Sequence, residues 1–498
     1  MIVKVDKLSH DLRGITKINN KITFVSDVLP NEIVDVKIIN EKKNFNEAKV
    51  ISYIEKSSDR IENKCPYSDK CGGCDFGYLN YKTSLMYKKN MVVDVMKRYA
   101  GLDINPSIIS SDNIFGYRNK ISLRINDGKL CLIEKNSNDY ISISRCLLVN
   151  DNINKVIGIL NDCDLYGIRD IVIRGTDEIM VIINGDDINN DIICRLDGNV
   201  SSIVFNGNVI YGKEYINILV DKFKYAIYPN SFFQVNTDMI RGLYDEVKES
   251  AGSGHSLLDL YCGAGTIGIY LADNFDDVHG IEINEDAVTG ANVNKKINNI
   301  KNISFDMVNA NSILINNYDV IVVDPPRGGL DKKTINNLLN SGAKKIVYVS
   351  CNTITLARDI DMLKDKYVLD KITLFDNFPN TKHVETVVLL SHKKPDSHIN
   401  IKVEFGEGEG KVPLKAIAER AEAYKPKERV TYKMIKEYIE AKYGFKVHTA
   451  YIAEVKRDLG LPMYDAPNAV EELKNPRKHP TAEKVEAIKD AMKYFEVI

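Results

Sequence analysis

Three side chains that could carry covalent chemistry stand where apolar, strand-like segments begin or end. They are Asp324, Cys351 and Glu385. A cysteine thiolate can act as a nucleophile, and a carboxylate can remove a proton. Each also has a structural interpretation, because free cysteine is usually a buried core residue and a single strand-end carboxylate is usually a solvated charge. Their shared position at strand ends favours a joint catalytic role.

A glycine-rich turn ends another apolar segment, at Leu257–Gly265. Glycines let the backbone approach a ligand, and the helix that follows leaves free N–H groups at its N-terminus. The turn reads G-x-G and lacks the third glycine of a dinucleotide fingerprint. Glu282, at the end of the next segment, can hold ribose hydroxyls. This combination favours S-adenosylmethionine over NAD, and a tight turn that binds nothing is the alternative.

Asp324 begins the sequence Asp-Pro-Pro-Arg, and Arg327 stands where amino-methyltransferases carry a base-stacking aromatic residue. The arginine therefore favours a nucleophile other than an amine. Carbon 5 of a uracil becomes such a nucleophile once a thiolate has added to carbon 6. This reaction needs a cysteine, a base and a methyl donor, and the target base must leave its stack. Cys351 is then the candidate nucleophile and Glu385 the candidate general base.

The motifs must be positioned by a domain in which strands and helices alternate from about residue 231. This alternation predicts a Rossmann-like, doubly wound α/β sheet, whose ligand-binding edge lies at the carboxyl ends of its strands. The expected domain spans residues 231–398. Its expected strands are Ser256–Leu260, Val278–Ile283, Ile303–Asp306, Val320–Asp324 and Lys345–Ser350, and its expected helices are Asp238–Ser250, Thr266–Asn274 and Glu285–Asn298.

Two further domains are expected on the N-terminal side, since 498 residues suffice for about three or more domains. Short alternating segments over residues 1–60 predict a small antiparallel β-barrel. Residues 61–230 read as a mixed α/β region. The expected strands are Lys21–Val25, Ile33–Ile39 and Ala48–Ile54 in the first part and Ile171–Arg174, Ile179–Ile183 and Ile216–Val220 in the second, which also holds an expected helix from Tyr81 to Tyr99.

The composition changes after Ser397, where Ser and Cys disappear. We expect a linker near Lys393–Gly410 and a separate helical extension over residues 399–498. Its expected helices are Thr431–Lys442 and Thr449–Leu459, the second ended by Gly460 and Pro462. Two helices joined by a short glycine turn resemble a helix-turn-helix. Its basic residues could face nucleic acid, and a helical domain that contacts protein is equally open; these residues are Lys446, His448, Lys456 and Arg457.

Four cysteines provide a candidate metal site. Cys65, Cys71 and Cys74 stand in a Gly-rich segment, and Cys146 is the best candidate for a fourth ligand. Four thiolates suit zinc or an iron–sulfur cluster, and their chemistry does not decide between the two. Four unliganded thiols are the remaining alternative. The other cysteines read as core or incidental residues, with Cys262 structural in the glycine turn; they are Cys131, Cys163, Cys194 and Cys262.

Charge and hydropathy limit the classes of function. A net charge of −2 removes the argument for nucleic-acid binding from bulk basicity. No apolar run approaches the roughly 18–20 residues of a membrane span. The segment MIVKVDKLSHD lacks the charged and apolar regions of a signal peptide. We therefore expect a cytoplasmic protein without a membrane partner, whose cysteines are not a disulfide framework.

Over about residues 1–392 the chain resembles the RNA 5-methyluridine methyltransferases, closest to the bacterial 23S ribosomal RNA enzymes. The resemblance is carried, in the family's order, by FFQVN, LDLYCGAGT, DPPRGGL, VSCN and HVETVVLL. It implies that Cys351 is the nucleophile and Glu385 the base. One departure is Thr353, where the family usually has proline, and we expect activity to survive it. The cofactor positions implied by the resemblance are Gln234, Tyr261, Thr266, Glu282, Asn309 and Asp324.

The resemblance also extends to the N-terminal region and the cysteines. The barrel looks like the family's TRAM domain, an RNA-binding barrel of OB type. The four cysteines resemble those of the branch that holds a structural [4Fe–4S] cluster. Five lysines could give the barrel a basic face for phosphates; they are Lys17, Lys37, Lys42, Lys43 and Lys49.

The resemblance and the residues together predict S-adenosylmethionine-dependent methylation of uridine carbon 5 in large-subunit ribosomal RNA, by a chain we expect to be a monomer. A transfer-RNA uracil-5 methyltransferase is the nearest alternative, because the mechanism would be the same. The simpler transfer-RNA enzymes of the family lack the TRAM domain and the cysteines, which argues against it. A non-catalytic RNA-binding or assembly factor, and an RNA or DNA amino-methyltransferase that would not need Cys351, are further alternatives.

Overall fold

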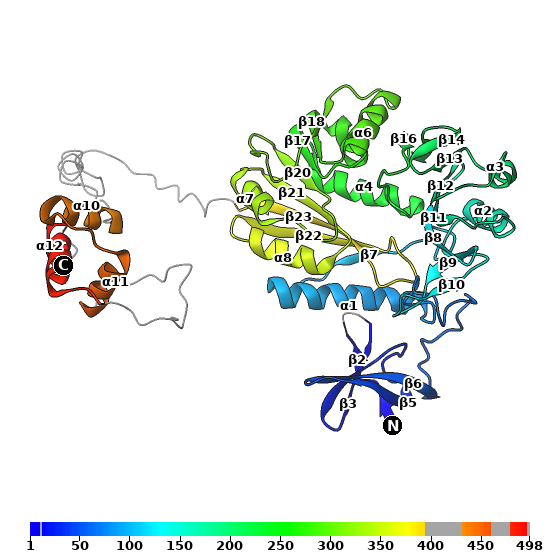
Figure 1. The fold of residues 1–498 in the computed structure, drawn as a ribbon, viewed down its shortest axis with the longest axis horizontal. Coiled ribbons are helices and arrows are strands. Elements are labelled where there is room, and N and C mark those ends of the chain that lie inside the picture. Colours follow the sequence, from blue (N-terminus) through cyan, green and yellow to red (C-terminus); the bar gives the residue numbers. More distant parts are fainter. Residues whose placement is uncertain (10–11, 394–430, 460–478, 496–498) are drawn as a thin grey trace, which may run out of the picture. The chain divides into compact units, whose positions relative to one another are not determined.

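The computed structural model describes residues 1–9, 12–393, 431–459 and 479–495. The chain divides into two compact units, Met1–Ser397 and His398–Ile498, which are treated separately below (Figure 1). The expected linker lies outside the described residues from position 394 onward, and so do Gly460 and Pro462.

The N-terminal sheet has six strands in the order β1-β5-β6-β4-β3-β2. β4 pairs with β6 in parallel, so the expectation of a wholly antiparallel barrel was wrong for this pair. β1 and β3 also approach each other, since the Thr16 hydroxyl of β3 donates to the Lys4 carbonyl of β1 at 2.8 Å. The strands are β1 (Ile2–Lys4), β2 (Lys7–Leu8), β3 (Gly14–Ile18), β4 (Lys21–Val25), β5 (Ile33–Glu41) and β6 (Phe45–Glu55).

The central region holds a seven-stranded sheet in the order β10-β9-β8-β11-β12-β13-β14 and a two-stranded ribbon, β15-β16. Its strands are β8 (Lys120–Asn126), β9 (Lys129–Ile133), β10 (Tyr140–Ser142), β11 (Ile168–Gly175), β12 (Ile179–Gly185), β13 (Ser202–Phe205), β14 (Asn208–Gly212), β15 (Ile216–Val220) and β16 (Phe223–Ile227). Helices α2 (Asp151–Asn161) and α3 (Asn190–Leu196) contribute to the core of this sheet.

An eight-stranded sheet follows, in the order β19-β18-β17-β20-β21-β23-β22-β7. The strands β19, β18, β17, β20 and β21 are parallel to one another, as the alternation of strands and helices predicted. β23 is antiparallel to both β21 and β22, so the sheet is not wholly parallel. The strands are β7 (Ser107–Ile109), β17 (Gly254–Leu260), β18 (Phe275–Glu282), β19 (Ile303–Met307), β20 (Val320–Val323), β21 (Lys345–Ser350), β22 (Tyr367–Phe375) and β23 (Glu385–His392).

Helices cover both faces of this sheet, and Figure 1 shows α4 and α6 on one side and α1 and α8 on the other. Alternate residues of β20 enter the two cores, Val322 on the α4–α6 side and Ile321 on the α1, α7 and α8 side. Burial on both faces explains why these strands read as continuous apolar runs. The helices are α1 (Tyr81–Ala100), α4 (Thr237–Ala251), α5 (Thr266–Leu271), the 3-10 turn Ala272–Asn274, α6 (Glu285–Ile297), α7 (Lys332–Asn340) and α8 (Thr353–Leu363).

The C-terminal unit contains three helices among its described residues, α10 (Tyr432–Tyr443), α11 (Thr449–Asp458) and α12 (Ala482–Tyr494). Only the first two helices were expected from the sequence, so the two-helix arrangement was incomplete. α12 belongs to the same core, because Ile488 packs with Ile439 and Ile452. Its buried face is mostly alanine and methionine, which gives a weak periodic signal in the sequence. No helix in the described parts of the chain is long and apolar enough to span a membrane.

A buried ion pair joins α1 to the end of β22. The Lys88 ammonium donates to Asp376 at 2.5 Å and to the Phe378 carbonyl at 3.0 Å, and both charged side chains are at most 1% exposed. Burial lowers the pKa of Lys88, and Asp376 opposes that effect. The pair therefore depends on both partners, since either one alone would be an uncompensated buried charge.

We expect Lys88→Ala to lower the free energy of unfolding by about 3–5 kcal/mol, because it strands the Asp376 carboxylate. Urea denaturation followed by circular dichroism measures this. Lys97→Ala is the matched control, since Lys97 lies on the same helix and pairs with Asp103 at 2.8 Å in full solvent. The control should not move the unfolding curve. Equal effects of the two substitutions would contradict the role given to the buried pair.

Candidate functional site

The glycine turn after β17 is shaped for close backbone approach. Tyr261, Gly263 and Gly265 all have positive φ, at 63°, 52° and 74°. A Cβ on Gly265 would lie 2.5 Å from the Phe305 ring, so only glycine fits there. The turn leads directly into α5, whose first residue is Thr266. The backbone N–H groups of this turn therefore line the carboxyl edge of the sheet.

Glu282 links this turn to the next one along the edge. Its carboxylate accepts from the Gly263 amide at 3.1 Å and from the Ile283 and Asn284 amides at 2.8 and 2.9 Å. The side chain is half-buried at the end of β18. Backbone donors thus fix a carboxylate in the place where a ribose is held in doubly wound folds.

The other expected cofactor residues lie around the same edge with different degrees of exposure. Thr266 accepts a hydrogen bond from the Tyr244 hydroxyl at 2.8 Å. Gln234 is buried in the segment that precedes α4. The Asn119 side-chain amide donates to the backbone carbonyl of Gln234 at 2.9 Å. Asn309 is exposed after β19, and its side-chain oxygen accepts from the Asn311 amide at 3.1 Å.

The antiparallel start of β23 brings Glu385 beside the end of β21. Ser350 faces Thr386 in the register, and the Thr386 hydroxyl donates to the Ser350 carbonyl at 2.9 Å. Cys351 is the next residue after Ser350 and is half-buried. Glu385 is only 2% exposed. The thiol and the carboxyl, which are 34 positions apart in the sequence, are therefore neighbours.

Burial and like charge dominate the electrostatics of this site. Burial, together with the nearby Glu385 and Asp324 carboxylates, raises the pKa of the Cys351 thiol to about 11. Burial and the Asp324 carboxylate also raise the pKa of Glu385 well above its usual range. Burial raises the pKa of Asp324 as well. Groups with such shifts at a strand edge are typical of acid–base sites.

Arg327 opposes these effects at Cys351. Its guanidinium lies beside the thiol and lowers the pKa of Cys351, and it lowers the pKa of Glu385 as well. The backbone of Arg327 is fixed to the residue that follows Cys351, because the Asn352 side-chain amide donates to the Arg327 carbonyl at 2.9 Å. In the sequence, Arg327 indicates only that the substrate nucleophile is not an amine, and no sequence pattern signals its contact with the thiol.

A fourth carboxyl lies beneath the glycine turn and was not anticipated. Asp259 is fully buried in β17, and one of its oxygens accepts from the Gly268 amide at 2.9 Å. Its other oxygen has no hydrogen-bond partner among the described residues. Burial raises the pKa of Asp259 to about 8. The signal in the sequence was an acidic residue inside an otherwise apolar strand.

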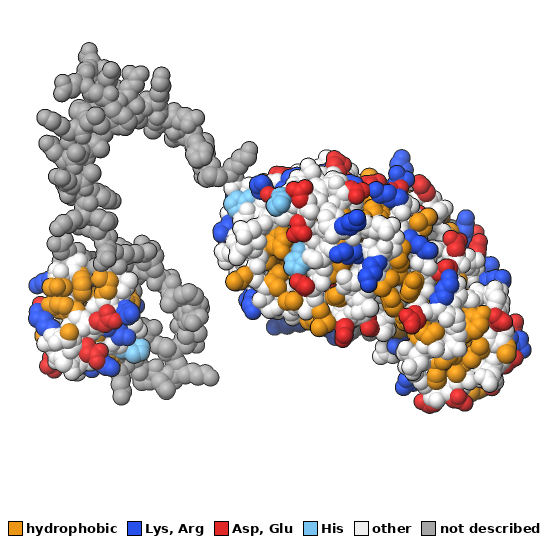
Figure 2. Space-filling view, turned by 90° about the horizontal axis from the view of Figure 1, so that it is seen from above, with side chains coloured by type: hydrophobic (Ala, Val, Ile, Leu, Met, Phe, Trp, Pro, Cys, Tyr) orange, Lys and Arg blue, Asp and Glu red, His pale blue; other side chains and the backbone are white. Residues whose placement is uncertain are grey.

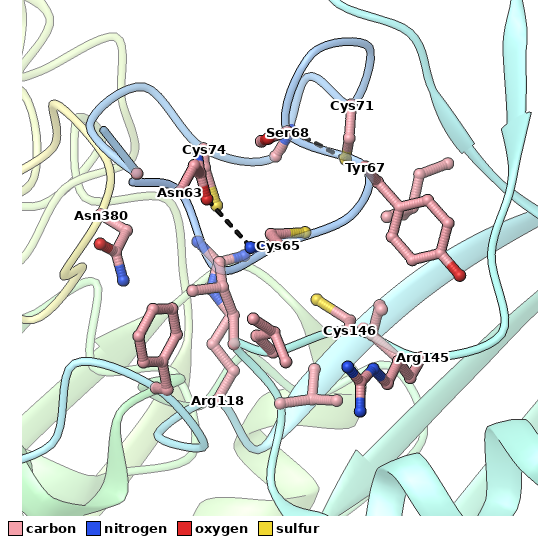
Figure 3. A pocket seen from close by; sticks show the side chains of 18 of the residues that line it. Asn63, Cys65, Tyr67, Ser68, Cys71, Cys74, Arg118, Arg145, Cys146 and Asn380 are labelled. Carbon is pink, nitrogen blue, oxygen red and sulfur yellow. Dashed lines mark hydrogen bonds between the residues drawn. The ribbon is translucent and has the colours of Figure 1, made fainter. Parts of the chain in front are cut away.

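The four cysteines expected as ligands surround one cavity of about 90 Å³ (Figure 3). Cys65, Cys71 and Cys74 come from the segment before α1, and Cys146 comes from the segment after β10. Burial, together with the other three thiols, raises the pKa of Cys74 to about 12. Burial raises the pKa of Cys71 and of Cys146 in the same way. The four thiols therefore lie within electrostatic reach of one another.

The four thiols are not arranged as the ligands of a metal ion in this structure. Within the described ranges, no three His, Cys, Asp or Glu side chains are arranged to hold one ion. Four thiolates on one zinc, at about 2.3 Å each, would bring the sulfurs to roughly 4 Å from one another. The cavity holds several times the space that one water molecule needs. The four thiols thus line one cavity, and thiolates are a donor set that suits zinc or an iron–sulfur cluster.

The remaining cysteines stand apart from this cavity. Cys131 and Cys163 are buried and Cys194 is exposed, all in the central region. Cys262 is buried in the core beneath the glycine turn, and burial raises its pKa well above the usual range. These positions agree with the structural or incidental roles that were expected.

The expected basic residues of the C-terminal unit are largely engaged within that unit. Lys446 pairs with Glu440 at 3.2 Å, and Lys456 lies 5.6 Å from the centre of the Tyr432 ring. His448 caps α11 by accepting from the Ala450 amide at 3.3 Å.

Comparison with known proteins gives matches over most of the first unit. A family profile described as tRNA (Uracil-5-)-methyltransferase matches residues 173–315 and 306–393, and a TRAM domain profile matches residues 1–51. An uncharacterized RNA methyltransferase of Halalkalibacterium halodurans is 32% identical over 443 residues, which cover 78% of this chain and 96% of that protein. Another from Staphylococcus aureus is 33% identical over 438 residues, with the same two coverages.

One solved structure is also similar over a long stretch. The tRNA (uracil-54, C5)-methyltransferase of Pyrococcus abyssi, in complex with S-adenosyl-L-homocysteine, matches with a TM-score of 0.67 and 29% identity. The match covers 78% of this chain and 100% of that chain.

The charges around Cys351 predict opposite shifts in two variants. Glu385→Gln removes a neighbouring anion and should lower the pKa of the Cys351 thiol, while Arg327→Ala removes the cation and should raise it. The pH dependence of iodoacetamide alkylation, read by mass spectrometry of the Cys351 peptide, measures both. Exposed Cys194 serves as the internal control and should not change. Shifts in the same direction would contradict this arrangement of charges.

Proposed function

The chain belongs to the family of RNA uracil-5 methyltransferases, and we propose that it methylates carbon 5 of a uridine in large-subunit ribosomal RNA through a covalent bond between Cys351 and the uracil. The observation that carries the proposal is the proximity of Cys351 and Glu385 at the edge that also bears the glycine turn. A nucleophile, a base and a cofactor edge in one place are what this reaction requires.

The proposed reaction proceeds in three steps. The Cys351 thiolate bonds to carbon 6 of the flipped uracil, and the electron pair of the 5,6 double bond moves to the carbonyl oxygen at carbon 4. S-adenosylmethionine supplies an electrophilic methyl group. Carbon 5 attacks that methyl carbon, and the thioether of the donor leaves. The Glu385 carboxylate removes the proton from carbon 5, and the freed pair restores the double bond as the bond to Cys351 breaks.

The environment of Glu385 suits this proton transfer. A buried carboxyl with a raised pKa binds a proton more tightly than an exposed one, which makes it a stronger base when ionised. Arg327 favours the thiolate form of Cys351 that begins the reaction. For the cofactor we propose a site built from Gln234, Tyr261, Thr266, Glu282, Asn309 and Asp324 around the glycine turn.

RNA binding would depend on local groups of basic side chains and not on the net charge of the protein. Figure 2 shows acidic and basic side chains interspersed on the visible face of the first unit, in keeping with a net charge of −2. In the TRAM domain, Lys37 and Lys49 lie directly opposite each other on β5 and β6, and both are exposed. Like charges in that position are unfavourable unless an anion lies between them, which supports a phosphate contact.

Transfer RNA is the second candidate substrate, and the Pyrococcus abyssi enzyme is the observation that favours it. The match covers the whole of that transfer-RNA enzyme and 78% of this chain. This share is close to the length of the first unit, Met1–Ser397. The presence of the N-terminal and central regions therefore does not separate the two substrates, contrary to the sequence-based argument. The choice depends on experiment.

Label transfer distinguishes these possibilities. Purified protein is incubated with labelled S-adenosylmethionine and unmodified ribosomal or transfer RNA, and the nucleosides are analysed by mass spectrometry. We expect label in 5-methyluridine of ribosomal RNA. Label in transfer RNA alone would agree with the mechanism but would make transfer RNA the substrate. Label in a methylated purine would overturn the mechanism.

Two substitutions test the covalent mechanism on whichever RNA is methylated. Cys351→Ala should abolish turnover and the adduct between protein and RNA. Glu385→Gln should reduce turnover by at least about 100-fold and let the methylated adduct accumulate, because the proton at carbon 5 stays in place. Denaturing gel electrophoresis detects the adduct. Normal methylation by Cys351→Ala, or loss of turnover without adduct in Glu385→Gln, would refute the assigned roles.

For the cysteine cavity we propose a [4Fe–4S] cluster with Cys65, Cys71, Cys74 and Cys146 as ligands. The convergence of four thiols on one cavity supports it. Thiols whose pKa values are raised by burial and by one another gain most from a positively charged partner. When bound, such a cluster supplies a rigid link between the segment before α1 and the central region.

Metal analysis tests the assignment. Protein purified without oxygen should contain iron and acid-labile sulfide in equal amounts, and Cys74→Ser should lose most of both. Cys194→Ser is the control, because that thiol is exposed and apart from the cavity. Recovery of zinc alone would contradict a cluster.

A further inference from the structure

The loop that joins β22 to β23, residues 376–384, determines where Glu385 begins its strand. We call it the base loop. The base loop is anchored at its start by the Lys88–Asp376 pair and in its middle by the Tyr117 hydroxyl, which donates to the Pro379 carbonyl at 2.9 Å. The Asn236 side-chain amide donates to the Asn377 carbonyl at 3.2 Å. The loop is therefore held by bonds from distant parts of the chain.

The anchors nearest Glu385 come from the cysteine loop, which we define as residues 65–77. The amides of Asp75 and Phe76 both donate to the Asn380 carbonyl at 2.9 Å. In the other direction, the Lys382 amide donates to the Asp75 carboxylate at 3.0 Å. These three hydrogen bonds join the cysteine loop and the base loop, with each loop supplying both donors and acceptors. Lys382 is only three residues before Glu385.

The conformation of Asn380 depends on this contact. Its φ is 63°, a left-handed value that side chains adopt at some cost. Its side-chain amide donates to the Ile114 carbonyl at 2.6 Å, and the residue lines the cysteine cavity (Figure 3). A strained turn persists only where its surroundings fix it, so the base loop and the cysteine loop stabilise each other.

Asp75 occupies the central position in this contact. It directly follows Cys74, so its backbone moves with a proposed cluster ligand, while its carboxylate holds the base loop. The mechanism proposed above gives Asp75 no role, and a half-buried carboxylate that accepts from a backbone amide more than 300 positions away is a specific tertiary bond.

We propose that Asp75 is a positioning residue for Glu385: it fixes the base loop against the cysteine loop, so that the Glu385 carboxyl reaches carbon 5 of the uracil only when the cysteine loop is in place. This inference rests on the proposed function, in which Glu385 removes the proton. A displacement of about 1 Å at a reacting group can cost about 100-fold in rate. The cysteine cavity thereby acts on the proton-transfer step without touching the substrate.

The test compares Asp75→Ala with Asp75→Asn and Asp69→Ala in the full-length, anaerobically purified protein. Asp75→Ala removes the acceptor for Lys382. Asp75→Asn keeps an acceptor oxygen and should restore most of the activity. Asp69 is exposed in the same loop and serves as the control that should behave as wild type.

For Asp75→Ala we expect kcat to fall about 10- to 100-fold while the KM for RNA changes less than about twofold. The methylated protein–RNA adduct should accumulate as in Glu385→Gln, because proton removal is the step that slows. Iron per chain should equal that of wild type. Loss of iron in proportion to activity, a rise in KM alone, or wild-type turnover would each overturn the proposal.

Hydrogen exchange gives a readout that needs neither RNA nor a correct substrate. Peptides that cover residues 376–385 should exchange faster in Asp75→Ala, and also in wild type after chelation of its metal, while peptides from β20 stay unchanged. Unchanged exchange in both samples would refute the link between the loops. Faster exchange with no methylation of any RNA by wild type would instead count against the proposed function alone.

Discussion

The pairing of β23 with β21 in opposite directions is the constraint on which the site depends. Because the strands are antiparallel, the first residue of β23 lies beside the last residue of β21. A parallel β23 of the same length would carry Glu385 to the other edge, roughly 20 Å from Cys351 at about 3.3 Å per residue. The backbone ladder, and not any contact between the two side chains, brings the thiol and the carboxyl together.

Burial at this edge then determines how the groups behave. Asp324, Glu385 and Cys351 are withdrawn from water beside one another, and each negative charge makes the next less favourable. The Asn352 side chain, next to Cys351, holds the backbone of Arg327 in place. The Arg327 charge therefore stays where it offsets part of this repulsion. Proton transfer and thiolate addition both gain from groups whose proton affinities are set by a common, poorly solvated environment.

The support behind this edge comes from far along the chain. The base loop is bonded to the cysteine loop, to α1 and to the segment before α4, across separations of more than a hundred residues. Such contacts are costly to form in chain entropy and give precise geometry once formed. The cysteine cavity and the reacting edge are therefore parts of one framework, although no single element contains both.

The sequence by itself determined the local elements and the chemistry that they carry. Strands at Lys21–Val25, Ile216–Val220 and Lys345–Ser350 were predicted with the bounds that the structure has, because apolar alternation and apolar runs are local signals. The glycine turn and Glu282 were readable for the same reason. The RNA methyltransferase family followed from motifs in order, which is also a property of the sequence.

Only the tertiary structure decided the direction of β23 and the contact of Arg327 with the thiol. A buried apolar strand reads the same in either direction, so residues 385–392 could not reveal their orientation. The bond between Asp75 and Lys382 joins residues with no local pattern in common. Periodicity reports which face of an element is buried, whereas the identity of the partner across a core or a loop is fixed only when the chain closes on itself.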